Sequence, residues 1–118
     1  MPVSPEFQAY LLEQLEPLGP VSARRMFGGA GLYYGNIMFA LLANDVMYLK
    51  VDEQSVCEFE AAGTEPFSYK RGDKQQALKS LWRVPDDVMD DPEQLIVWCR
   101  RAVDAALVAS RKKAKKKN

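Results

Sequence analysis

Residues 26–52 read MFGGAGLYYGNIMFALLANDVMYLKVD, and this stretch decides the fold because tight turns divide it into short apolar segments. We predict four strands in it and just before it, at Val21 to Phe27, Leu32 to Tyr34, Ile37 to Ala43 and Val46 to Lys50. Gly28 to Gly31 is predicted to be a flexible break. Gly35-Asn36 suits a type II′ hairpin turn, and both residues of Asn44-Asp45 tolerate positive φ. Turns this short join antiparallel strands, so the stretch predicts a β-meander.

Three helices are predicted around the meander from their capping residues. Ser4 followed by Pro5 begins the first helix, and Gly19-Pro20 ends it. Asp52 can cap a second helix that ends at Gly63, and Asp91-Pro92 begins a third. Apolar residues recur at helical spacing in the first and third helices, at Phe7, Leu11, Leu15 and Leu18, and at Leu95, Trp98, Ala102, Ala105, Ala106 and Ala109.

A second hairpin is predicted around Gly72-Asp73, with strands at Phe67 to Arg71 and Ala77 to Val84. The second of these segments would also tolerate a helix. The resulting order is α-β-β-β-β-α-β-β-α, which predicts an α+β fold with an antiparallel β-meander sheet and three helices. The 118 residues suit one domain. We expect that domain to span residues 1–110 and to be followed by a disordered basic tail, residues 111–118.

The third predicted strand is apolar on both faces. Simple alternation directs one set of side chains to one face, Ile37, Phe39, Leu41 and Ala43, and the other set to the opposite face, Met38, Ala40 and Leu42. A sheet with one solvated face alternates apolar and polar residues more cleanly. We therefore expect either a helix on each face or a second subunit on one of them, and a homodimer is one of the predictions.

The chain contains no histidine, and this excludes the Ser-His-Asp and Cys-His catalytic arrangements and the usual zinc sites. Cys57 and Cys99 lack a CxxC partner, and both are interpreted as small reduced core residues. No apolar run reaches the roughly 18 residues that a membrane helix needs, and no signal peptide is visible. The sequence therefore predicts a cytoplasmic protein without metal, cofactor or catalytic residues.

The net charge of zero conceals an asymmetry along the chain. Six of the 16 basic residues lie in the last eight positions, so residues 1–110 carry a net charge of about −6. An acidic body is not typical of a nucleic-acid-binding fold. The one predicted nucleic-acid element is the tail, a weak and salt-dependent site made of Arg111, Lys112, Lys113, Lys115, Lys116 and Lys117. A solubilising tail is the alternative.

The glycine cluster beside Arg24 and Arg25 is the other candidate site. A dinucleotide-binding loop needs G-x-G-x-x-G between a strand and a helix, whereas here a strand follows and the third glycine is displaced to Gly35. We interpret the glycines as residues that permit a bulge or a sharp connection between strands. The alternative is a contact with a partner or an anion, made by Arg24, Arg25, Gly28, Gly29 and Gly31. The two adjacent arginines should point to opposite faces of their strand.

Two further groups of residues have ordinary structural interpretations. The carboxylates Asp86, Asp87, Asp90 and Asp91 lack the spacing of a calcium loop and are predicted to form a solvated, helix-capping segment. The aromatic residues of the strands lack interleaved basic residues and are predicted to pack in the core or at an interface. They are Tyr33, Tyr34, Tyr48 and Tyr69.

Three runs of the meander resemble the N-terminal domain of the TfoX/Sxy family. They are Met26-Phe27-Gly28-Gly29-Ala30-Gly31-Leu32-Tyr33, Met38-Phe39-Ala40 and Met47-Tyr48-Leu49-Lys50-Val51-Asp52. Downstream, Pro66-Phe67-Ser68-Tyr69 and Leu81-Trp82-Arg83-Val84-Pro85 extend the resemblance, which covers roughly residues 22–109. The resemblance implies a regulator of natural competence in bacteria that acts with a cyclic-AMP-responsive activator at promoters. Such regulators usually carry a second, helical domain, so we expect a stand-alone N-terminal module here. The family supplies no catalytic or cofactor residues.

Three function hypotheses follow. The first is a non-catalytic regulatory or protein-binding module linked to transcription of competence genes, whose partner belongs to the transcription machinery. The second is non-specific nucleic-acid binding through the tail. The third is a small-ligand binder or an enzyme, which would need a concave site with converging polar groups near Gly28 to Gly31.

Overall fold

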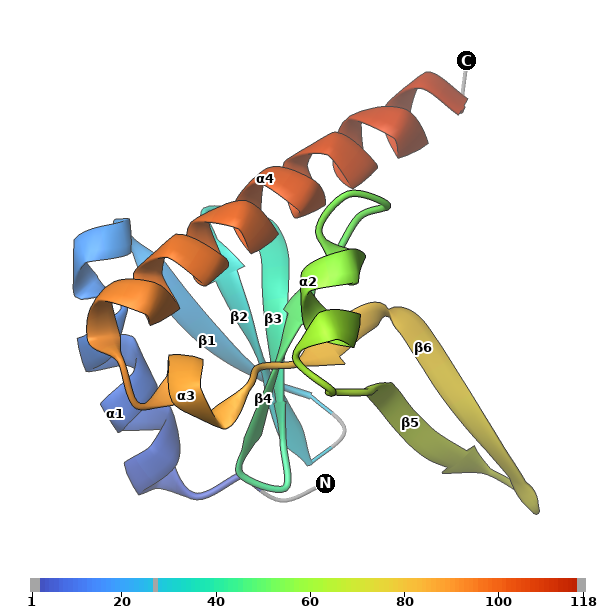
Figure 1. Cartoon of the computed structure of the whole chain (residues 1–118), viewed down its shortest axis with the longest axis horizontal. Coiled ribbons are helices and arrows are strands. Elements are labelled where there is room, and N and C mark those ends of the chain that lie inside the picture. The colour runs from blue at the N-terminus through green and yellow to red at the C-terminus, as the bar shows by residue number, and fades with distance from the viewer. Residues whose placement is uncertain (1–2, 27, 117–118) are drawn as a thin grey trace.

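The computed structural model describes residues 3–26 and 28–116. Its elements are α1 (Pro5–Gln14), the 3-10 helix η1 (Glu16–Leu18), β1 (Val21–Met26), β2 (Gly29–Tyr34), β3 (Ile37–Ala43), β4 (Val46–Lys50), α2 (Val56–Ala61), β5 (Pro66–Arg71), β6 (Lys74–Arg83), α3 (Asp86–Met89) and α4 (Pro92–Lys116). The predicted α+β class and antiparallel meander are confirmed, because the six strands form one antiparallel sheet in the order β1-β2-β3-β4-β6-β5 (Figure 1).

Helices α1 and α4 begin where the sequence places their caps, whereas α2 begins at Val56 with Ser55 as its N-cap instead of the predicted Asp52. The Ser4 hydroxyl accepts the Phe7 N–H of α1 at 3.2 Å. Asp91 caps α4 in the same way, because one of its carboxylate oxygens accepts the N–H groups of Glu93 and Gln94 at 3.1 and 3.2 Å. These contacts satisfy backbone donors that have no partner inside the helix.

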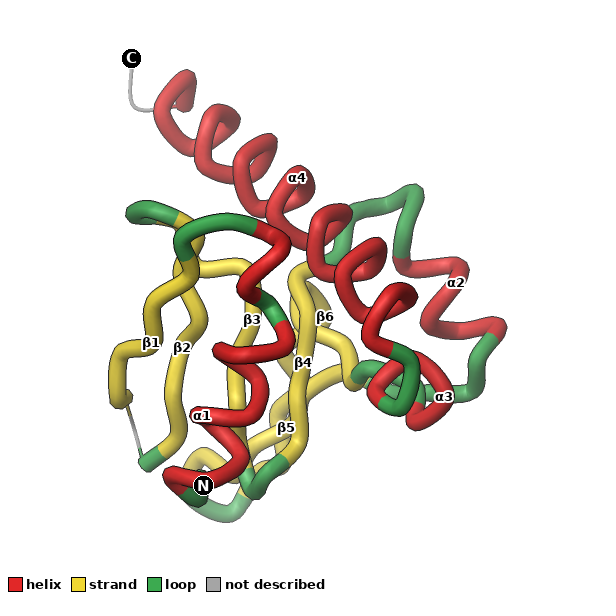
Figure 2. The backbone as a smooth tube through the Cα atoms, turned by 90° about the vertical axis from the view of Figure 1, so that its left-hand side faces the viewer, coloured by secondary structure: helices red, strands yellow, loops and turns green. Residues whose placement is uncertain are grey.

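Helices cover one face of the sheet. In Figure 2, α1 and α4 lie in front of the strands, and α4 packs on β3 and β4 while α1 packs on β1. The main core lies between these layers, and α2 joins it through an edge-to-face contact of Phe59 with Trp98, whose ring centroids are 4.8 Å apart. Fully buried residues of this core include Leu11, Leu15, Leu32, Phe39, Leu42, Leu49 and Leu95.

A β-bulge in β3 changes the predicted faces of that strand. Leu32 pairs with Ala40, but Tyr33 pairs with Met38, so Phe39 is an extra residue without a partner in β2. The bulge reverses the alternation, and Phe39 joins Ala40 in the main core while Met38 joins Leu41 on the opposite face. The prediction that Phe39 and Leu41 share one face is therefore wrong.

Gly29 to Gly31 of the glycine cluster form the start of a strand and not the predicted flexible break. β2 begins at Gly29, and its first residues pair with β1, Gly29 with Met26 and Gly31 with Arg24. The turn lies before it, where Gly28 has a φ of 78°. Phe27, the predicted end of the first strand, lies outside the described residues. The sequence pattern did not predict a strand here because glycine has a low strand propensity. Pairing with the neighbouring strands overrides that propensity.

The two predicted hairpin turns of the meander are confirmed. Gly35 has a φ of 62°, as the first position of a type II′ turn requires. Asn44 and Asp45 both have positive φ, 54° and 56°, and so form the turn between β3 and β4.

The second hairpin is longer than predicted and leaves the body as an arm, defined here as residues 67–79 (Figure 1). β6 begins at Lys74 rather than Ala77 and is a strand throughout. Pro66 pairs with Trp82, whereas Phe67 pairs with Leu78, so the register shifts at the root of the arm. Such an irregularity bends a strand and increases its twist. Only the last residues of β6, from Leu81 onward, pair with β4.

Two further segments differ from the predictions. Asp86–Met89 forms the short helix α3 within the predicted acidic loop, where the two aspartates of its first turn suit the positive end of the helix. Helix α4 continues through Lys116, so residues 111–116 prolong the helix instead of forming a separate tail. Alanine, arginine and lysine are strong helix formers, and cations suit a helix C-terminus. Within the described residues, none of the helices has the length and apolar character needed to cross a membrane.

Candidate functional site

A groove opens on the sheet face that the helices leave uncovered. It has a volume of roughly 800 Å³ and lies between the meander strands and the arm. Its floor is formed by Leu41, Phe67 and Leu81, which belong to a second cluster of buried residues. Polar side chains contribute to the lining at Asn44, Ser68 and Gln75, and Lys70 is the charged residue among the lining side chains. The groove is therefore mainly apolar.

Aromatic rings connect the sheet to the arm across this groove. Tyr48 on β4 meets Phe67 on β5 edge-to-face, with the ring centroids 5.1 Å apart. Phe67 in turn stacks on Tyr69, with the centroids 6.0 Å apart. The Tyr69 hydroxyl donates a hydrogen bond to Gln76 on the neighbouring strand at 3.2 Å. Burial, followed by the charge of Glu65, raises the pKa of the Tyr48 phenol, so Tyr48 stays neutral near pH 7.

Gly31 makes room for two methionines at the end of the groove. A Cβ atom at Gly31 would lie 2.9 Å from both the Met26 Cε and the Met38 Sδ, and 3.1 Å from Tyr33 Cε1. Both methionines line the groove. The absence of a side chain at Gly31 therefore lets flexible thioether side chains cover the strand there. Methionine is a residue that adapts to irregular apolar contacts.

Arg24 and Arg25 point to opposite faces, as their adjacency predicts. The Arg24 guanidinium carbon lies 4.8 Å from the centroid of the Tyr33 ring. Arg25 donates to the Val3 carbonyl oxygen at 3.4 Å. Arg24 therefore stands on the groove side with Gly31, its partner across the strands. Arg25 is directed toward the N-terminal segment and does not join them.

Charge is segregated by secondary structure in the described part of the chain. The strands contain no aspartate or glutamate. Their basic residues are Arg24, Arg25, Lys50, Lys70, Arg71, Lys74, Lys79 and Arg83. Apart from those in the turns between strands, the acidic residues lie in the helices and in the segments that flank them. The net negative charge of residues 1–110 therefore hides a basic sheet and arm.

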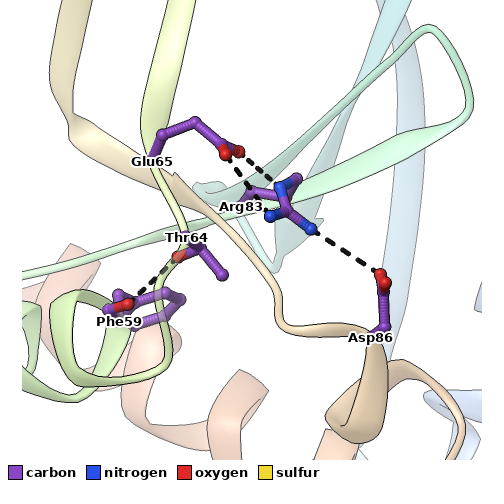
Figure 3. Close-up of polar contacts among 5 residues, drawn as sticks. All are labelled: Phe59, Thr64, Glu65, Arg83 and Asp86. Carbon is purple, nitrogen blue, oxygen red and sulfur yellow. Dashed lines mark hydrogen bonds and ion pairs between the residues drawn. The ribbon is translucent and has the colours of Figure 1, made fainter.

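The root of the arm is fixed by Arg83 at the end of β6. Its guanidinium binds both carboxylate oxygens of Glu65, and it lies 3.6 Å from a carboxylate oxygen of Asp86 (Figure 3). The Arg83 backbone N–H donates to the Glu65 carbonyl oxygen at 3.0 Å. Just before Glu65, the Thr64 hydroxyl donates to the Phe59 carbonyl oxygen at 3.3 Å. These contacts tie the arm to α2 and α3.

The cysteines differ in their surroundings. Cys99 is buried, and burial raises the pKa of its thiol to about 12, so it stays protonated and inert. Cys57 is exposed on α2, so the prediction that it is a core residue is wrong, because it falls on the outer side of that helix. Within the described residues, no group of three or more Cys, Asp or Glu side chains is arranged to hold a metal ion.

The structure brings together only some of the predicted site residues. Arg24, Gly29 and Gly31 lie on or beside the groove face, whereas Arg25 does not. Of the tail cations, Arg111 is exposed on α4, Lys112, Lys113, Lys115 and Lys116 lie in its last turns, and Lys117 lies outside the described residues. The sequence did not identify most of the groove residues as a site. An apolar strand has the same sequence pattern whether its face is covered by a helix or open to solvent.

A comparison with protein families agrees with this fold and its boundaries. The family model described as the TfoX N-terminal domain matches residues 13–106. The match runs from the end of α1 into α4 and includes every strand and the whole arm. No curated protein matches the chain.

Proposed function

This chain belongs to the TfoX N-terminal domain family, and from that premise we propose that it is a non-catalytic regulatory module that acts by binding another protein. The family supports a competence-related regulatory domain. Action on transcription of competence genes, with a partner from the transcription machinery, is part of the proposal and rests on the family alone.

The apolar groove is the feature that best supports a protein-binding function. Its floor residues are almost fully buried, with Leu81 2% and Phe67 6% exposed, whereas Leu78 at its edge is 41% exposed. An apolar floor with an exposed apolar edge and few polar groups is typical of protein contacts. Catalysis would need converging polar or titratable groups, and the titratable side chains among the residues that line the groove are Tyr48, Tyr69 and Lys70.

The charge around the groove indicates which kind of partner would bind in it. The charged residues within the strands are all basic, and Arg24 and Lys70 stand at this face. An acidic segment that presents apolar anchors, such as Leu or Phe between Asp and Glu, satisfies both features of the groove. A second copy joined through the same face would bring two basic surfaces together, so the charge distribution favours a different protein over a homodimer.

A methyl-resolved titration tests this proposal. The chain is labelled at its methionine methyl groups and titrated with a synthetic peptide of about 12 residues that alternates Leu or Phe with Asp or Glu. Met26 and Met38 line the groove, whereas Met47 is buried in the main core and Met89 packs against it. We expect the resonances of Met26 and Met38 to shift and those of Met47 and Met89 to stay.

Matched substitutions locate the contact. Leu78→Asp places a carboxylate at the groove edge and should weaken peptide binding at least about tenfold. Val97→Asp is the control, because Val97 is similarly exposed, 45% against 41%, and lies on α4. A peptide with Lys in place of its acidic residues should not bind. Equal loss in both variants, or shifts at Met47 without shifts at Met38, would overturn the proposal.

A further inference from the structure

We propose that the β5–β6 arm, whose Lys70 also lines the groove, binds the phosphate backbone of double-stranded DNA. Four cations lie on the arm, Lys70, Arg71, Lys74 and Lys79, against one acidic residue, Asp73. All four are exposed. The ion pairs found in the described part of the chain involve Arg83 and Arg101, so none of them neutralises an arm cation.

The tip of the arm carries a like-charge pair. Arg71 and Lys74 lie directly opposite each other on either side of the Gly72-Asp73 turn. Like charges directly opposite across two strands destabilise a hairpin. A bound polyanion removes this repulsion, since each cation then faces a phosphate. The arrangement therefore lowers the stability of the free arm and favours an anionic ligand.

The shape of the arm suits a DNA groove. It is a two-stranded ribbon that extends away from the body (Figure 1). The six residues of β5, at about 3.3 Å each, give a reach of roughly 20 Å. The major groove of B-form DNA, about 12 Å wide, admits a two-stranded ribbon. The major groove of A-form RNA is too narrow, so the geometry selects DNA over duplex RNA.

The chemistry of the tip distinguishes DNA from an acidic protein. Residues 70–75 are all polar, charged or glycine, and every one of them is exposed. Protein contacts depend on buried aromatic or apolar anchors, which this segment lacks. Contacts with phosphates need only exposed cations on a rigid frame. The acidic side chains of α1, α3 and the start of α4 are repelled by DNA, so the duplex should approach from the arm side.

A salt titration of DNA binding tests the proposal. The full chain and the variant Lys70→Gln/Arg71→Gln/Lys74→Gln/Lys79→Gln are titrated with a labelled duplex of about 20 base pairs, between about 50 and 200 mM NaCl. Each phosphate contact contributes about −0.9 to the slope of log K against log salt, so the variant should lose about 3 to 4 units of slope. Circular dichroism should be unchanged and urea unfolding should show no loss of stability, since all four side chains are exposed.

A truncation after Ser110 is the control, because it removes Arg111 and the five lysines that follow it in the sequence and leaves the arm intact. This shorter chain should still bind DNA, and neutralising its arm should abolish that binding. Four outcomes would overturn the proposal. They are no DNA binding by the full chain, an unchanged slope in the arm variant, equal binding of a duplex RNA, and equal binding of polyglutamate.

Discussion

Arg83, the last residue of β6, binds Glu65, the residue before β5, through two guanidinium–carboxylate hydrogen bonds, one of them 3.3 Å long. The two residues lie 18 positions apart and close the base of the arm (Figure 3). The ion pair raises the pKa of Arg83, chiefly through the hydrogen bond to Glu65. The geometry is bidentate, which is the strongest form of such a pair.

A double-mutant cycle should measure this pair. Glu65→Gln, Arg83→Gln and the double variant are compared by urea unfolding. The side chains are 58% and 29% exposed, so solvent screening limits the coupling energy to about 0.5 to 1 kcal/mol. The coupling should decrease in high salt. A coupling energy indistinguishable from zero at low salt would mean that the backbone pairing alone holds the arm.

Gly28 should be the glycine of the cluster that is most sensitive to substitution. Its φ of 78° lies in the left-handed region, so Gly28→Ala should lower the free energy of unfolding by about 1 to 2 kcal/mol. Gly29→Ala is the control, because Gly29 lies in the extended backbone of β2. Urea unfolding of both variants measures the difference. A larger loss for Gly29→Ala would contradict this assignment of the turn.

Asp52 should make stability depend on pH. Its carboxylate accepts the N–H groups of Ser55 and Gln54 at 2.7 and 3.0 Å, and the hydrogen bond from Ser55 is the main reason that its pKa is lowered from 3.8. A lowered pKa in the folded state stabilises the fold above pH 3.8, and this contribution is lost as the pH falls through the folded value.

Comparison with Asp52→Asn isolates that contribution. At pH 7 the native chain should be more stable by a few tenths of a kcal/mol, because the carboxylate is exposed and screened. The difference in unfolding free energy should shrink toward zero below pH 3.8. A difference that stays constant from pH 7 to pH 2 would show that the charge of Asp52 does not contribute to the stability of the fold.

The two cysteines should react at very different rates. Cys57 is exposed and should be modified by a thiol reagent within minutes at pH 8, whereas buried Cys99, with a thiol pKa of about 12, should react only after unfolding. Cys57→Ser should remove the fast phase completely. Two fast thiols in the native chain would place Cys99 at the surface and contradict its burial in the main core.

Local signals predicted most elements of this fold. The caps at Ser4 and Asp91 and the turn at Asn44-Asp45 all lie where the sequence places them. Each depends on hydrogen bonds or φ preferences within a few residues, which the sequence specifies directly. The strand at Gly29 to Gly31 was missed for the same reason, since glycine favours no local conformation and only pairing with β1 orders it.

The sequence by itself determined the order of the elements, their caps and turns, and the antiparallel meander. Tertiary structure alone decided the bulge at Phe39, the departure of the arm from the sheet at Phe67, the open apolar groove and the gathering of basic residues on the sheet. The reason is physical. Turns and caps are local interactions, whereas a bulge, an uncovered face and a charge pattern depend on which distant segments pair and which face the helices cover.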